Sequence, residues 1–131
     1  MPVTSLYAAI FGLLLVVLSV RTLRLRRQLR IGIGHGDDPR MERAMRVHAN
    51  FCEYVPIALL LMYLFEQSVG GNYWAHGLGI CLLTGRVLHA FGVSQAKEDY
   101  RFRVLGMVLT FIVIISASGR LLLAHAGWFS A

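Results

Sequence analysis

Cysteine and charge are both scarce in this chain. Of its 131 residues only two are cysteine, and 15% are charged. Cys52 and Cys81 lie inside apolar runs at a separation unlike that of metal ligands, so we expect small, buried, reduced side chains and no disulfide scaffold. His35, His76 and His125 also lack a metal-binding spacing, and we expect no metal site. The sequence contains no glycine-rich phosphate loop, no G-x-S-x-G motif and no cysteine–histidine pair at a spacing known from catalysis.

The composition is too apolar for an ordinary water-soluble domain. Hydrophobic residues make up 56% of the chain and the mean hydropathy is +0.61, whereas soluble domains are about 45–50% apolar. The net charge of +6 could indicate nucleic-acid binding, but most of the positive charge lies between Arg21 and Arg46, beside apolar runs. This placement is typical of membrane proteins, so we set the nucleic-acid interpretation aside.

Four apolar runs are each long enough to cross a bilayer, which requires about 20 residues. They predict a single all-α domain over residues 1–131, an integral membrane four-helix bundle with helices at about 3–27, 43–66, 73–94 and 103–126. The first run, Val3–Val20, could be a signal peptide. No positive charge precedes it, however, and Arg21 follows it in place of a small-residue cleavage site, so we keep it as a membrane span. Short polar links make successive helices antiparallel neighbours.

Arginine and lysine are unevenly distributed among the links. The first link carries six arginines from Arg21 to Arg40, and the third link carries Lys97, Arg101 and Arg103. The second link and the N-terminal tail contain neither residue type. By the positive-inside rule, both basic links face the cytoplasm and both termini face the other side.

A polar stripe follows one face of the second predicted helix. Arg43, Arg46, Asn50 and Glu53 are spaced by three, four and three residues, which places them within a sector of roughly 80° on a helix. An ionisable group inside a span costs at least roughly 2.5–3.5 kcal/mol unless it is paired or hydrated. The stripe is therefore either an internal salt-bridge ladder or a site for a polar ligand. His48 lies on the opposite side of the helix and is expected to be a packed or interfacial histidine.

The other helices add basic residues at a similar depth. They are Arg24 at the end of the first helix, Arg86 and His89 on the third, and Arg101 and Arg103 at the start of the fourth. Guanidinium groups bind carboxylates through paired hydrogen bonds. In the stripe, Glu53 can bind an ammonium group of a ligand, and Asn50 can bind an amide group of the ligand. Together these groups indicate a zwitterionic, peptide-like anion as the ligand.

The polar stripe lies within a recognisable motif. The segment from Glu42 to Pro56, E-R-A-M-R-V-H-A-N-F-C-E-Y-V-P, resembles the second-helix signature of the MAPEG superfamily, the membrane-associated proteins in eicosanoid and glutathione metabolism. Gly85–His89 is similar to the third-helix G-R-x-x-H of that family, and Arg103–Met107 to the start of its fourth helix. The resemblance extends over the whole chain in length, helix count and topology, and is closest to short bacterial members.

The resemblance implies a homotrimer in the bacterial inner membrane with glutathione as co-substrate, bound between subunits near the cytoplasmic side. With the stripe, it gives the candidate glutathione-binding residues Arg24, Arg43, Arg46, Asn50, Glu53, Tyr54, Arg86 and His89, with Arg24 supplied by the neighbouring subunit. It assigns activation of the thiol to Arg103 or, as second choice, Arg101. The implied activity is a glutathione transferase or peroxidase that acts on lipophilic electrophiles or lipid hydroperoxides.

Three positions depart from the family pattern. Val93, Ala49 and Val104 stand where some members carry tyrosine, arginine and serine, respectively. Two other functions are open: a glutathione- or lipid-binding scaffold of the same fold without catalysis, and a small multidrug transporter of similar length. The intact stripe favours the enzyme over the scaffold. A transporter of that kind needs an acid in its first helix, and this one is uncharged as far as Arg21.

Overall fold

A computed structural model gives the fold and describes residues 1–69, 72–97 and 99–127. The regular elements in these ranges are the helices α1 (Val3–Leu29), α2 (Pro39–Val69), α3 (Asn72–Ser94) and α4 (Tyr100–His125). All four helices are long and apolar enough to cross a membrane. The expected all-α, four-helix architecture is confirmed.

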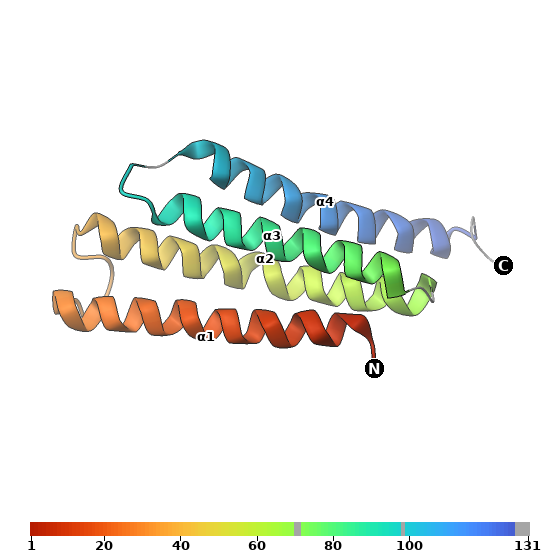
Figure 1. Cartoon of the computed structure of the whole chain (residues 1–131), viewed down its shortest axis with the longest axis horizontal. Helices are drawn as coiled ribbons and strands as arrows, with labels where there is room; N and C mark the ends of the chain where they lie inside the picture. The colour runs from red at the N-terminus through yellow and green to blue at the C-terminus, as the bar shows by residue number, and fades with distance from the viewer. Residues whose placement is uncertain (70–71, 98, 128–131) are drawn as a thin grey trace.

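The helices run alternately in opposite directions (Figure 1). α2 and α3 form the centre of the bundle, because each of them contacts the three other helices. α1 and α4 lie on opposite sides of this pair and do not contact each other within the described residues. The links that follow α1 and α3 lie at one end, here termed the basic end, and the start of α1 and the end of α4 lie at the other.

Two helices begin earlier than the apolar pattern predicts, at residue 39 rather than about 43 and at residue 100 rather than about 103. Asp38 precedes α2, and its Oδ1 accepts hydrogen bonds from two backbone N–H groups of the first turn, at 2.8 and 3.4 Å. Asp99 precedes α4 and accepts one such bond from Arg101 at 3.0 Å. Aspartate at this position satisfies N–H groups that have no partner inside the helix. The side chain of Arg40 also donates to Asp38, and this lowers the pKa of that carboxyl to about 2.

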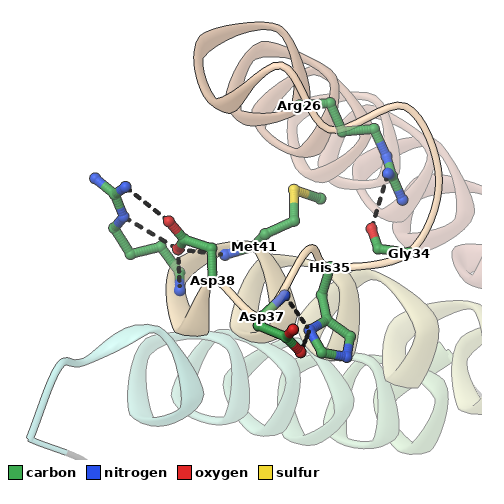
Figure 2. Close-up of polar contacts among 7 residues, drawn as sticks. Arg26, Gly34, His35, Asp37, Asp38 and Met41 are labelled. Carbon is green, nitrogen blue, oxygen red and sulfur yellow. Dashed lines mark hydrogen bonds and ion pairs between the residues drawn. The ribbon is translucent and has the colours of Figure 1, made fainter.

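The link between α1 and α2 has a defined conformation (Figure 2). Arg26 of α1 donates to the carbonyl oxygen of Gly34 at 3.0 Å, and Nδ1 of His35 accepts the backbone N–H of Asp37 at 3.1 Å. Gly34 and Gly36 have φ angles of 70° and 57°, in the left-handed region that glycine adopts without steric cost. The link therefore returns the chain directly to the start of α2, beside the end of α1.

A buried carboxylate caps α1 at the opposite end of the bundle, although the hydrophobic pattern does not reveal it. Glu66 of α2 is 7% exposed and accepts the backbone N–H groups of Val3 at 2.5 Å and Thr4 at 2.9 Å. These groups belong to the first turn of α1, which has no acceptor within its own helix, and the helix dipole favours an anion there. The hydroxyl of Tyr7 also donates to the carbonyl oxygen of His76 at 3.2 Å. α1 is therefore tied to both α2 and α3 at this end.

α3 and α4 approach each other closely at three glycines. A Cβ atom on Gly106 of α4 would lie 2.5 Å from the carbonyl oxygen of Gly85 and 2.7 Å from the nitrogen of His89. A Cβ atom on Gly92 would lie 2.9 Å from the nitrogen of Arg103. Small residues that allow backbones to approach are typical of helix contacts in membranes. This close crossing brings the first turn of α4 against the last turns of α3.

The outer surface of the bundle is apolar as well as its core. Large apolar side chains are exposed along α1 and α4, among them Leu13 at 71%, Val17 at 61% and Ile115 at 70%. Water-soluble monomers rarely expose contiguous apolar patches of this kind. This surface is suited to contact with lipid or with other copies of the chain.

Candidate functional site

The basic end of the bundle contains a cavity of about 500 Å³ between α2, α3 and α4, here termed the polar cavity. Cavities of this size hold small-molecule ligands. Its lining includes residues of the stripe together with residues of α3 and α4. The candidate residues among them are Arg43, Arg46, Asn50, Glu53, His89 and Arg103. Groups from three helices therefore meet at one site.

The lining of the polar cavity carries charges of both signs. Arg43, Arg46 and Arg103 contribute three guanidinium groups, and Glu42 and Glu53 contribute two carboxylates. In the part of the chain that the structure describes, Arg46 and Glu53 form no ion pair with each other. The stripe is therefore not an internal salt-bridge ladder between these two residues. Both side chains are exposed, so their charges are accessible to a ligand.

Arg86 reaches this site indirectly, because it is 3% exposed and does not line the polar cavity. Its Nη1 donates to Oδ1 of Asn50 at 2.6 Å, and its Nη2 donates to the carbonyl oxygen of Gly106 at 3.4 Å. The ring of Tyr54 lies 5.9 Å from the guanidinium carbon, within cation–π range. A guanidinium has only hydrogen-bond donors, so its partner on Asn50 is the amide oxygen. The NH₂ group of Asn50 is therefore left to donate to a ligand. Arg86 and Tyr54 are thus placed to position the stripe.

The two arginines at the start of α4 differ in where they lie. Arg103 lines the polar cavity together with His89, which is 5% exposed. Arg101 does not line this cavity. Its side chain is exposed, and its backbone N–H bonds to Asp99. Of the two arginines, Arg103 is therefore the one that faces the polar cavity.

Arg43 lies between the polar cavity and a second cavity. Its guanidinium donates to the carbonyl oxygens of Gln95 and Ala96, just beyond the end of α3, where a cation complements the helix dipole. It also lines a cavity of about 820 Å³ between α1, α2 and the end of α3, here termed the α1 cavity. Arg24 lines the α1 cavity and not the polar cavity. Within one chain, Arg24 is therefore separated from the ligand site to which the resemblance assigns it.

Three other lining residues affect the space and the charge of the polar cavity. Ala49 and Val93, two of the positions that depart from the family pattern, both line it. Small apolar side chains there leave space that a tyrosine or an arginine would occupy. Glu42 lines the cavity as well but was not among the candidate residues. Its spacing of four residues from Arg46 was the available signal, since this spacing puts two residues on the same helix face.

The remaining histidine and cysteine side chains lie apart from the polar cavity. Nε2 of His48 lies 2.9 Å from Oγ of Ser19 on α1, so this histidine is packed against α1, one of the two placements expected for it. Cys52 was expected to be buried but is exposed, because an apolar run in this bundle also covers the outer surface. Cys81 is partly buried, as expected. Among the described residues, no group of three or more histidine, cysteine or acidic residues could hold a metal ion.

Comparison with known proteins identifies the family. The model of the MAPEG family matches residues 4–123, which include most of all four helices. The chain is 36% identical over 113 residues to the inner membrane protein YecN of Escherichia coli strain K12, and the match covers 86% of this chain and 85% of that protein. The protein of the same name from Escherichia coli O6:H1 strain CFT073 matches with the same identity and coverage. The chain therefore belongs to the MAPEG family, whose members are membrane proteins associated with eicosanoid and glutathione metabolism.

Proposed function

We propose that this protein binds glutathione in the polar cavity and activates its thiol for attack on a lipophilic electrophile or a lipid hydroperoxide. Guanidinium, amide and carboxylate groups from three helices meet in this one cavity of about 500 Å³, and this is the observation that carries the proposal. Membership of the MAPEG family supports the choice of ligand.

The charges of the lining complement those of glutathione. At neutral pH the tripeptide carries two carboxylates and one ammonium, and ionisation of its thiol adds a further negative charge. The lining offers three arginines and two glutamates, and guanidinium groups bind carboxylates through strong, paired hydrogen bonds. Asn50, whose amide oxygen is occupied by Arg86, would donate its NH₂ group to a carbonyl or carboxylate oxygen of the peptide.

In this proposal, Arg103 lowers the pKa of the glutathione thiol. A free thiol has a pKa of about 8.5, and a guanidinium within hydrogen-bond reach favours the thiolate, which is the nucleophile. The proton leaves to water at the open end of the cavity. In conjugation, the sulfur forms a bond to an electrophilic carbon, and the electron pair of the broken bond goes to a leaving group that takes up a proton. In hydroperoxide reduction, two glutathione molecules would yield one disulfide, one alcohol and one water.

The second substrate would reach the cavity from the bilayer, where the bundle is apolar. Ala49 and Val93 would provide a small apolar wall beside the thiol. We propose a homotrimer in the inner membrane with the basic end toward the cytoplasm. In this assembly, Arg24 would contact the glutathione of a neighbouring copy, because its own chain places it in a different cavity.

The test is a glutathione titration of the detergent-purified protein with ultraviolet absorbance at the thiolate band. We expect saturable binding and a thiolate signal at neutral pH. Arg103→Gln should lose the thiolate signal while it keeps most of the binding, since the other arginines of the lining are intact. Arg101→Gln is the matched control and should behave like the wild type.

Each other outcome has a defined meaning. Binding without a thiolate signal in the wild type would favour a non-catalytic scaffold of the same fold. No binding at millimolar glutathione would reject the ligand assignment. An unchanged thiolate signal in Arg103→Gln would reject the role of that arginine.

A further inference from the structure

The α1 cavity is larger than the polar cavity and has a different character. It has a volume of about 820 Å³ and lies between α1, the start of α2 and the residues that end α3. The proposed glutathione chemistry uses only two of its lining residues, Arg43 and, through a neighbouring copy, Arg24; its valines and its other two arginines are left unused. Its lining therefore calls for a ligand of another kind.

The lining of the α1 cavity divides into an apolar part and a basic part. Val16, Val17 and Val20 of α1 form an apolar wall. The basic part consists of four arginines, Arg21, Arg24, Arg40 and Arg43. No acidic residue is among the described residues that line it, in contrast to the two glutamates of the polar cavity. A ligand that fits both parts has an anionic head and an apolar tail.

The two parts also follow one another along the membrane normal. The valines belong to the uncharged run that ends at Val20, and the first arginine follows at Arg21. A boundary of this kind lies at the interface between the hydrocarbon core and the headgroups. The apolar wall is therefore at the depth of acyl chains, and the arginines are at the depth of phosphates.

Three of the four arginines are held by hydrogen bonds or an ion pair, and all four retain donors. Nη1 of Arg21 donates to Oγ of Ser94 at 2.7 Å, which fixes this guanidinium between α1 and the end of α3 while its other nitrogens can still donate. Arg24 has no hydrogen bond or ion pair to any other described residue. Arg40 is paired with Asp38 through a contact of 2.8 Å, so a lipid phosphate would share this arginine with the aspartate.

We propose that the α1 cavity binds the headgroup of an anionic phospholipid, with an acyl chain along the valine wall. Basic pockets between transmembrane helices are suited to anionic headgroups, and arginine binds phosphate through paired hydrogen bonds. A soluble anion would leave the valine wall without a partner, and a zwitterionic lipid would bring its own cation among the arginines. Arg24 and Arg43 also serve the proposed glutathione site, whereas Arg21 and Arg40 do not, so variants of this second pair separate the two proposals.

The test compares lipids with the purified full-length protein in a neutral detergent. Short-chain phosphatidylglycerol, phosphatidylcholine of the same chain length and inorganic phosphate are titrated separately, and binding is followed by native mass spectrometry and by the shift in Tm. We expect phosphatidylglycerol to bind and raise Tm, with a smaller effect of phosphatidylcholine and none of inorganic phosphate. Arg21→Gln should weaken phosphatidylglycerol binding about fivefold, which corresponds to roughly 1 kcal/mol per basic residue at an anionic surface.

Arg27→Gln is the matched control, because Arg27 is also an exposed arginine of α1 but does not line the α1 cavity. Equal losses in Arg21→Gln and Arg27→Gln would overturn the proposal in favour of a general attraction to the basic link. Equal effects of the two lipids, or of phosphatidylglycerol and inorganic phosphate, in the wild type would overturn it without any variant. Glutathione binding should be unchanged in Arg21→Gln, so failure of one proposal leaves the other measurable.

Discussion

Arg86 offers a sharp test of how the polar cavity is organised. It is 3% exposed, and its guanidinium donates to Oδ1 of Asn50 at 2.6 Å. A hydrogen bond to a charged group contributes about 1.5–3 kcal/mol. In Arg86→Gln this bond is lost, and the amide of Asn50 can rotate away from the orientation that presents its NH₂ group to the ligand. We expect the dissociation constant of glutathione to rise about tenfold, or about 1.4 kcal/mol.

A double-mutant cycle separates this indirect effect from a direct contact. Glutathione binding is measured by titration calorimetry for the wild type, Arg86→Gln, Asn50→Ala and the double variant. Because Arg86 acts through Asn50, the double variant should lose little more affinity than either single variant. The expected coupling energy is about 1–2 kcal/mol, or about 5- to 30-fold in the dissociation constant.

Additive losses would refute this reasoning, because they would mean that Arg86 affects glutathione without the Asn50 amide. Arg86 also bonds to the carbonyl oxygen of Gly106 on α4, so its removal could loosen the bundle. Thermal unfolding of each variant in detergent controls for this. A variant that keeps its helical signal and unfolds cooperatively qualifies for the cycle.

Three further predictions concern the fold. Glu66→Ala leaves two backbone N–H groups of α1 without their acceptors and should lower the free energy of unfolding by about 2–4 kcal/mol, measured by denaturant titration; an unchanged midpoint would contradict the capping role. Gly106→Val places a side chain 2.5 Å from the carbonyl oxygen of Gly85 and should destabilise the protein by about 1–3 kcal/mol, whereas Gly119→Val on the same helix, with open space around it, should have little effect. The pKa of Asp38 is lowered from 3.8 to about 2, so its ionisation stabilises the fold fully above about pH 4, and this contribution is lost as the pH falls through about 2. Asp38→Asn should remove this part of the pH dependence of Tm, and identical slopes for both proteins between pH 2 and 4 would count against it.

Hydropathy along the chain was sufficient for the four helices, because a membrane span must be long and apolar wherever it lies in the bundle. It was less informative about where helices begin. Asp38 and Asp99 cap the starts of α2 and α4. Both lie in polar segments, which a hydropathy pattern does not count as part of a span. The two aspartates were themselves a signal for the helix starts, because a side-chain oxygen just before a helix accepts backbone N–H groups of its first turn.

The spacing of the polar stripe correctly predicted which residues of α2 share one face of that helix. Periodicity records which residues share a face, and Arg46, Asn50 and Glu53 do line one cavity. Periodicity carries no information about distances between helices. Arg86 shares a depth with the stripe, yet it lies behind Asn50 rather than in the cavity.

The sequence by itself thus determined the membrane class, the number of spans, the polar stripe and the family resemblance, because these depend on local composition and periodicity. Only the tertiary structure decided which arginine faces which cavity. It separated Arg24 from the stripe and placed Arg103 rather than Arg101 on the polar cavity. The physical reason is that these relations depend on how closely two helices cross. For Arg103, which lies on α4, the crossing is set at Gly85 and Gly106, where the missing side chains let the backbones of α3 and α4 come together.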